Sequence, residues 1–216
     1  MVIKAVLFDM DGTILDSEYM HTKVLQEVVK ERTGIDISKE EIRKYIGLRY
    51  SEKLEKIFTK RGIKKDTKKL GIIVKEKSLE NSHLVKKMDE ADEIIQEMKE
   101  NFKIALVTGS SKEQAEIFLE GVNLKKYFDI MISSSDVKRK KPYPDCYLVA
   151  AEKLKVKPKE CVVIEDSVVG VEGAKNAEMF CIAIPNKYIK NGNFSKADLI
   201  VDSLKEITSK MIKRLN

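Results

Sequence analysis

Residues 2–13 read VIKAVLFDMDGT, and this stretch decides the fold. Its first seven residues are mostly apolar and rich in Val, Ile and Leu, which predicts a buried strand. Asp9 and Asp11 follow directly, so their side chains share one face of an extended segment, and a loop beginning at Gly12 can turn both into one pocket. Ligands of open α/β sheets bind at the carboxyl ends of strands. The stretch therefore predicts a strand that ends in a ligand site.

Similar short apolar runs recur along the chain, and longer amphipathic segments separate them. The runs are KIALVT (103–108), IMIS (130–133), CVVIE (161–165), FCIAI (180–184) and LIV (199–201). Apolar residues at helical spacing occupy 89–101, 112–121, 145–154 and 169–178. This alternation requires crossover connections and a mostly parallel sheet covered on both faces. We therefore expect an α/β protein with a Rossmann-like, three-layer parallel-sheet core.

One interval breaks the alternation. More than ninety residues separate the first strand from KIALVT, and their pattern is helical without a convincing strand. This is too long for a single crossover, and Gly34, Gly47 and Gly62 are placed to end or link helices. We expect an inserted all-α helical cap at residues 17–82, with the catalytic core formed by 1–16 and 83–216.

Composition excludes several classes of protein. The 216 residues are 43% apolar, no stretch approaches the roughly 18 apolar residues of a membrane span, and the sequence starts without a basic leader. We expect a cytoplasmic monomer without a membrane partner. The net charge of +6 is distributed as Lys alternating with Glu, without a basic patch interleaved with aromatic residues, so we expect no nucleic-acid partner. The three cysteines lack metal-ligand spacing and are expected to be free thiols.

Chemically compatible groups follow four of the predicted strands. Asp9 and Asp11 follow the first strand, and the next three are followed by Thr108-Gly109-Ser110-Ser111, by Lys141-Pro142 and by Glu165-Asp166-Ser167. Each group alone has an ordinary reading as a turn, a helix cap, a loop lysine or the acidic start of a helix. Their joint occurrence at successive strand ends favours a catalytic site.

Phosphoryl transfer needs positioning and charge neutralisation, and these groups can supply both. The Asp9 carboxylate can attack phosphorus, while Asp11 can protonate the leaving oxygen and later deprotonate water. Carboxylates beside a phosphate dianion require a hard cation; Mg²⁺ fits best, with Asp166 as anchor and Glu165 as a second candidate. Lys141 supplies positive charge, and the remaining donors to phosphate are the Thr108 hydroxyl and the backbone amides of Gly109 and Ser110.

Four motifs resemble those of the haloacid dehalogenase (HAD) superfamily of phosphotransferases. They are DMDGT, VTGSS, KKPYPD and VVIEDSVVGVEGAKNA, in the family's order and over nearly the whole chain. The pattern is similar to the branch that contains β-phosphoglucomutases and sugar-phosphate phosphatases, which carries a helical cap after the first motif. Two departures are visible, because Lys140 stands where Gly is common and Asp89-Glu90 stands where Pro-Gly is usual.

The resemblance implies a role for each motif residue. Asp9 is implied as the nucleophile and a Mg²⁺ ligand, and Asp11 as the general acid/base that also ligates Mg²⁺ through its backbone carbonyl. Phosphate binding is implied for Thr108 and Lys141, and metal binding for Glu165 and Asp166. In the cap, three weaker candidates for substrate binding or hinge motion are His21, Arg49, which is offset by one residue from the family's arginine, and Lys77.

Three functions are compatible with these residues. The first is a Mg²⁺-dependent phosphatase that hydrolyses a small phosphomonoester, such as a sugar phosphate, through phospho-Asp9. The second is a phosphomutase of the β-phosphoglucomutase type, which returns the phosphoryl group to another sugar hydroxyl; His21 supports it. The third, a non-enzymatic phospho-receiver module, is disfavoured because Asp9 closes the first strand and a cap follows. We expect the phosphatase, with a small phosphorylated metabolite as its partner.

Overall fold

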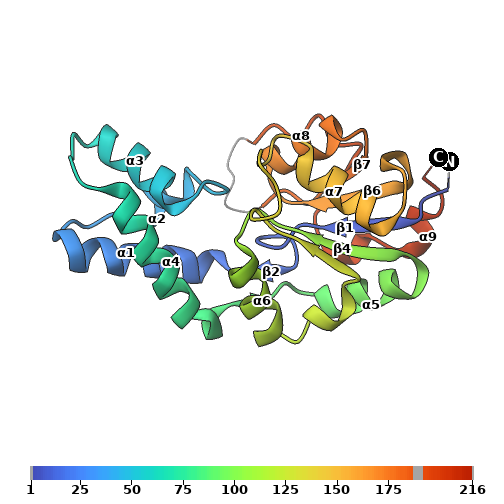
Figure 1. Cartoon of the computed structure of the whole chain (residues 1–216), viewed down its shortest axis with the longest axis horizontal. Coiled ribbons are helices and arrows are strands. Elements are labelled where there is room, and N and C mark those ends of the chain that lie inside the picture. The colour runs from blue at the N-terminus through green and yellow to red at the C-terminus, as the bar shows by residue number, and fades with distance from the viewer. Residues whose placement is uncertain (1, 187–191, 216) are drawn as a thin grey trace. The chain divides into compact units, whose positions relative to one another are not determined.

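The computed structural model describes residues 2–186 and 192–215 and forms two compact units. A six-stranded parallel sheet forms the centre of the first unit, which comprises Met1–Asp16 and Lys86–Asn216 (Figure 1). The strand order is β5-β4-β1-β6-β7-β8, with β1 at Ala5–Phe8, β4 at Lys103–Val107, β5 at Ile130–Ile132, β6 at Cys161–Glu165, β7 at Phe180–Ala183 and β8 at Leu199–Ile200. Each neighbouring pair is parallel. The predicted α/β fold is confirmed.

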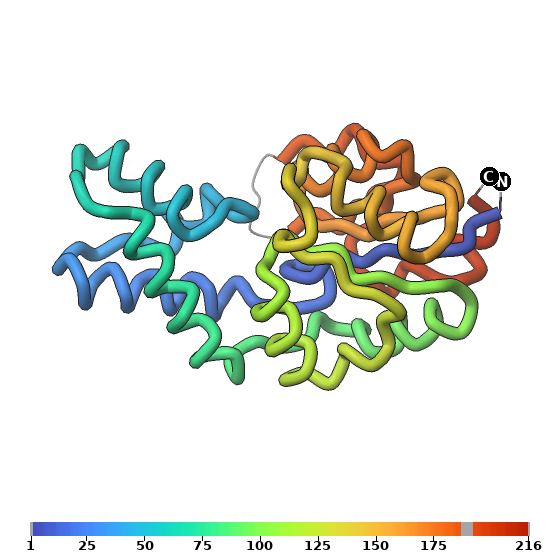
Figure 2. Tube along the Cα trace, in the orientation of Figure 1, coloured from blue at the N-terminus to red at the C-terminus, as the bar shows by residue number. Residues whose placement is uncertain are grey.

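The first strand lies in the middle of the sheet although it begins the chain, as the trace shows (Figure 2). All four residues of β1 are buried, as their apolar sequence predicts. The register pairs Phe8 with Leu106 of β4 on one side and with Ile164 of β6 on the other. The residues that follow these three strands therefore lie along one edge of the sheet.

Helices cover both faces of the sheet, which gives the three expected layers (Figure 1). The helices of this unit are α5 (Ala91–Asn101), α6 (Lys112–Gly121), α7 (Asp145–Leu154), α8 (Val168–Asn176) and α9 (Ser209–Ile212), with short 3₁₀ turns η2 (Lys125–Tyr127), η3 (Pro158–Glu160) and η4 (Leu204–Glu206). Small side chains of the central strands pack against α7 and α8; they include Ala5, Ala105, Cys161 and Cys181. These small residues let the two helices approach the sheet closely.

A short antiparallel ribbon lies where the chain leaves and re-enters this unit. Strand β2 (Leu15–Asp16) pairs with β3 (Lys86–Lys87). The interval was expected to hold no strand, and that expectation is wrong for these four residues. Two-residue strands carry no periodicity of their own, and both residues of β3 are exposed lysines, so only the tertiary pairing reveals them.

The second compact unit is helical and comprises Ser17–Val85. Its elements are α1 (Glu18–Thr33), α2 (Lys39–Arg43), α3 (Tyr50–Lys60), α4 (Thr67–Glu80) and the 3₁₀ turn η1 (Ser82–Leu84). Gly34 ends α1 in a left-handed conformation, with φ 73°. The turn η1 packs on α1 and α4, so the unit extends to Val85 and not to the expected residue 82. Within residues 2–186 and 192–215, no helix has the length and apolar character to cross a membrane.

Glu90 adopts a left-handed conformation just before α5, with φ 61°. It stands at the position where the family resemblance expects glycine, and a residue with a Cβ is strained there. We expect Glu90→Gly to raise the free energy of unfolding by about 1 kcal/mol, measured by urea denaturation. Glu93→Gly, at an exposed position inside α5, is the control and should lower it by about 1 kcal/mol. Equal destabilisation by both variants would contradict the assigned strain.

Candidate active site

Asp9 lies at the carboxyl end of β1 and is nearly buried, with 7% of its surface exposed. Its backbone N–H donates to the carbonyl of Ile164 at 3.0 Å, which continues the sheet register by one residue. Glu165 ends the neighbouring strand β6 and is fully buried, and Asp166 follows it with 2% exposure. The sheet thus brings the first and fourth motifs together as predicted.

The three carboxylates form one buried cluster. One ligand oxygen each from Asp9, Glu165 and Asp166 lies within 4.8 Å of the others. Burial, and then the charge of Glu165, raise the pKa of Asp9 to about 8. Burial, and then the charge of Asp9, raise the pKa of Asp166 well above its ordinary value. The cluster is therefore short of positive charge, and its hard oxygen donors suit a cation such as Mg²⁺.

Lys141 provides the positive charge that the protein itself places in the cluster. Its Nζ donates to Asp9 Oδ1 at 2.6 Å, to Glu165 Oε1 at 2.6 Å and to the carbonyl of Val107 at 3.0 Å. Burial alone would lower the pKa of Lys141, but Asp9 and Glu165 outweigh it and raise that pKa well above its ordinary value. Lys141 consequently stays charged beside Asp9 and Glu165.

Glu165 is held by protein donors on both of its oxygens. Oε2 accepts from the N–H of Asp166 at 3.0 Å, and from the N–H and hydroxyl of Ser167 at 3.0 and 2.9 Å. Burial opposes ionisation, yet Lys141 and these Ser167 bonds hold the pKa of the Glu165 carboxyl below its ordinary value. Glu165 is therefore an ionised carboxylate whose lone pairs are already well supplied with donors.

The second motif lies against Asp11. Thr108 follows β4, is 2% exposed, and continues the sheet by donating its N–H to Ile132. The Ser110 N–H donates to Thr108 Oγ1 at 3.0 Å, and the Ser110 hydroxyl donates to Asp11 Oδ2 at 2.7 Å. Lys141 thus donates to the side chain of Asp9, and Ser110 donates to that of Asp11. Gly109 lies between Thr108 and Ser110, and a Cβ there would meet no atom within 4 Å.

Gly12 lets the loop after β1 approach Asp166. Its φ is +90°, and a Cβ built on it would lie 2.0 Å from Asp166 Oδ2 and 2.5 Å from Asn186 Nδ2. Asn186 was missed by the sequence analysis; its Nδ2 donates to Asp166 Oδ2 at 2.7 Å. It follows β7, so inspection of the next strand end would have found it. Gly12 and Asn186 together orient the Asp166 carboxylate.

Comparison of the whole sequence with known proteins identifies the family to which this site belongs. Residues 6–184 match the model of the haloacid dehalogenase-like hydrolases. The chain belongs to this family. The phosphorylated carbohydrates phosphatase of Thermotoga maritima is 34% identical, over 81% of this hydrolase and 82% of its own length. Hexitol phosphatase B of Escherichia coli is 31% identical over 96% of both chains.

Solved structures agree with this membership. CbbY from Rhodobacter sphaeroides in complex with xylulose-1,5-bisphosphate has a TM-score of 0.86 with this hydrolase, at 25% identity and with 100% of both chains covered. The resemblance noted from the four motifs is confirmed. The chain is therefore an enzyme with the α/β core of the haloacid dehalogenase-like hydrolases.

The three cap candidates of this hydrolase lie in the helical unit. His21 Nδ1 forms a hydrogen bond with the hydroxyl of Tyr50, which also bonds Ser78 Oγ at 2.8 Å. Arg49 precedes α3 and has a half-exposed side chain 3.8 Å from Glu52. Lys77 donates to Glu80 at 3.0 Å. The contact of His21 with Tyr50 joins α1 to α3, and Ser78 adds α4.

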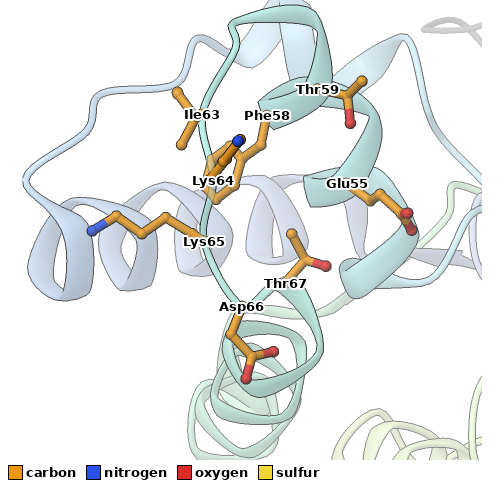
Figure 3. A pocket seen from close by; sticks show the side chains of 8 residues that line it. All are labelled: Glu55, Phe58, Thr59, Ile63, Lys64, Lys65, Asp66 and Thr67. Carbon is orange, nitrogen blue, oxygen red and sulfur yellow. The ribbon is translucent and has the colours of Figure 1, made fainter.

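A hollow of about 500 Å³ also lies in the helical unit of this hydrolase, next to α3 (Figure 3). It is lined by Glu55, Phe58, Thr59, Ile63, Lys64, Lys65, Asp66 and Thr67. None of the predicted site residues is among them. The hollow therefore does not coincide with the chemical groups described above.

Proposed function

We propose that this hydrolase is a Mg²⁺-dependent phosphatase of phosphorylated carbohydrates that works through an aspartyl-phosphate at Asp9. The observation that carries the proposal is the Asp9 carboxylate, buried 2.6 Å from the Lys141 ammonium within the acidic cluster. The names of the two phosphatase relatives and the sugar bisphosphate bound to CbbY support the substrate class. We thus propose that the small phosphorylated metabolite expected from the sequence is a sugar phosphate.

The reaction has two half-steps. In the first, an Asp9 carboxylate oxygen attacks phosphorus, the bond from phosphorus to the sugar oxygen breaks, and Asp11 gives its proton to that oxygen. In the second, Asp11 takes a proton from water as the water oxygen attacks phosphorus, and the bond to Asp9 breaks. Lys141 can neutralise charge on the transferred group, and Thr108, Gly109 and Ser110 are the proposed donors to its oxygens.

The carboxyl groups of Asp9 and Asp166 fit a divalent cation, as their raised pKa values indicate. Asp9 and Asp166 are the proposed side-chain ligands, with the backbone carbonyl of Asp11. Glu165 is proposed to support the metal site, because its oxygens are taken up by protein donors. When bound, the ion would neutralise the repulsion between these carboxylates and a phosphate dianion.

Metal binding should release a proton from the cluster. The Asp9 pKa of about 8 means that the metal-free protein keeps this proton at pH 7, whereas a ligand carboxylate must be ionised. We expect EDTA to abolish phosphatase activity and Mg²⁺ to restore it. The half-saturating Mg²⁺ concentration should fall as the pH rises towards 8, by about tenfold per pH unit for the Asp9 proton and more steeply where Asp166 also loses one. Calorimetry in buffers of different ionisation heat measures the proton, and Mg²⁺ binding that is independent of pH would contradict this assignment.

A substrate panel tests the proposed function. Hexose and hexitol phosphates, phosphoglycolate and pyrophosphate are compared with Mg²⁺ and with EDTA. We expect the highest kcat/KM for a sugar or hexitol phosphate, with stoichiometric release of inorganic phosphate. With β-glucose 1-phosphate, formation of glucose 6-phosphate in place of free phosphate would establish the mutase instead. His21 is the residue whose substitution would then be examined, because the sequence links it to that alternative.

A further inference from the structure

Tyr147 is a fully buried polar side chain next to the catalytic cluster, and nothing in the proposed chemistry uses it. It lies in the first turns of α7, among the apolar residues that fill the space between this helix and the sheet. A phenylalanine would fill the same apolar space without the cost of burying a hydroxyl. The presence of a buried hydroxyl at this position is therefore explained by the groups that it contacts.

Those partners belong to the active site. The Tyr147 hydroxyl donates to Glu165 Oε1 at 2.9 Å, the same oxygen that accepts from Lys141 Nζ at 2.6 Å. Its oxygen also lies 3.4 Å from the carbonyl of Gly170, and the Lys141 ammonium lies 5.1 Å from the centre of the tyrosine ring. Tyr147 thus contacts both members of the Lys141–Glu165 ion pair.

The surrounding helix leaves no room for these side chains to shift towards it. A Cβ on Gly170 of α8 would lie 1.8 Å from Glu165 Oε1, and a Cβ on Gly173 would lie 3.1 Å from Tyr147 Cε2. Two glycines one helical turn apart therefore allow Glu165 and Tyr147 to pack under α8. Tyr147 thus donates to Oε1 of the Glu165 carboxylate, while Ser167, the N-cap residue of α8, donates to Oε2.

We propose that Tyr147 is a positioning residue: its hydroxyl fixes Glu165 Oε1, and through that oxygen it holds Lys141 beside Asp9. The inference rests on the proposed phosphoryl transfer. Among the described residues, Lys141 and Tyr147 donate to Oε1. Without the tyrosine hydroxyl, Oε1 would keep only its bond with Lys141, and no second donor would fix the position of this oxygen beside the ammonium. A misplaced Lys141 would neutralise the transferred phosphoryl group less well. The loss would be largest in the transition state, where the charge of the phosphoryl group is redistributed.

Tyr147→Phe tests this inference, and Tyr143→Phe is its matched control. Tyr143 loses the same hydroxyl four residues earlier, but its side chain is 52% exposed. We expect Tyr147→Phe to lower kcat about tenfold or more and to change KM less than about threefold. This is the effect of replacing a residue that orients a side chain of a metal site without touching the substrate. The control should retain wild-type kcat. Wild-type kcat in Tyr147→Phe would overturn the inference, as would a loss fully accounted for by a smaller folded fraction in thermal denaturation.

Binding of orthovanadate, an analogue of the transferred group, separates this inference from the proposed function. In the presence of Mg²⁺, Tyr147→Phe should weaken vanadate binding at least about fivefold, whereas Tyr143→Phe should not. If the wild type hydrolyses no phosphomonoester but this difference in binding appears, the proposed function fails and the positioning role stands. If the wild type and Tyr147→Phe bind vanadate equally well and have equal kcat on an active substrate, the positioning role is contradicted and the proposed function stands.

Discussion

Asp9→Asn is expected to lower kcat by at least about 10³-fold, because an amide cannot replace the attacking carboxylate. The geometry permits a clean test, since Asn has nearly the same shape and its amide oxygen can still accept from Lys141 Nζ, as Asp9 Oδ1 does at 2.6 Å. Phosphate release in the presence of saturating Mg²⁺ measures the effect. Near wild-type turnover by the purified variant would show that Asp9 is not the nucleophile.

The same substitution should not reduce the stability of the metal-free protein. The folded-state pKa of Asp9 is raised to about 8, above that of an unfolded aspartate. Its ionised form therefore opposes folding at pH values above the unfolded pKa, and this cost grows until about pH 8. Asn carries no charge, so the thermal midpoint of the metal-free variant at pH 8 should equal or exceed that of the wild type. A lost activity with a lowered midpoint would instead indicate misfolding.

Lys141→Ala is expected to have the second largest effect, on both activity and stability. Removing the ammonium leaves Asp9 and Glu165 buried without the cation that each contacts at 2.6 Å. Breaking a buried ion pair in this way costs about 3 kcal/mol of unfolding free energy. We expect kcat to fall by about 10²- to 10³-fold as well, because charge on the transferred phosphoryl group loses a preorganised partner.

Lys138→Ala is the control for this prediction, because Lys138 is an exposed lysine in the same loop. It should change kcat less than about twofold and the unfolding free energy less than about 0.5 kcal/mol. Urea denaturation and steady-state kinetics of both variants provide the comparison. If the two variants behave alike, Lys141 does not have the role assigned to it.

The convergence of the motifs could be predicted because it follows from parallel-sheet geometry. Asp9 and Lys141 are 132 residues apart, yet both follow strands whose carboxyl ends meet at one edge. The apolar runs predicted the strands, and the polar residues that follow these runs predicted the candidate site. The direction of the strands alone brings their carboxyl ends together, so this prediction did not depend on knowing any side-chain contact.

The supporting residues could not be predicted in the same way. Tyr147 has the apolar spacing of an ordinary core residue of α7, and only the tertiary structure shows its hydroxyl on Glu165. Asn186 follows a strand that carries no recognised motif, and it lies two residues beyond the matched family region that ends at 184. Likewise, Tyr50 is the partner of His21 across 29 residues of helical sequence. Such pairings depend on side-chain packing and leave no local pattern.

Trapping of the phosphorylated enzyme shows directly whether Asp9 carries the phosphoryl group. The enzyme is mixed with its best sugar phosphate and Mg²⁺ and quenched in acid within one turnover. Borohydride then reduces the acyl phosphate, and fragmentation of the peptide from Ala5 to Lys23 separates Asp9 from Asp11 and Asp16. We expect homoserine in place of Asp9, with Asp11 and Asp16 unmodified. Phosphate release in the same time course with unmodified Asp9, or with the modification at another residue, would contradict it.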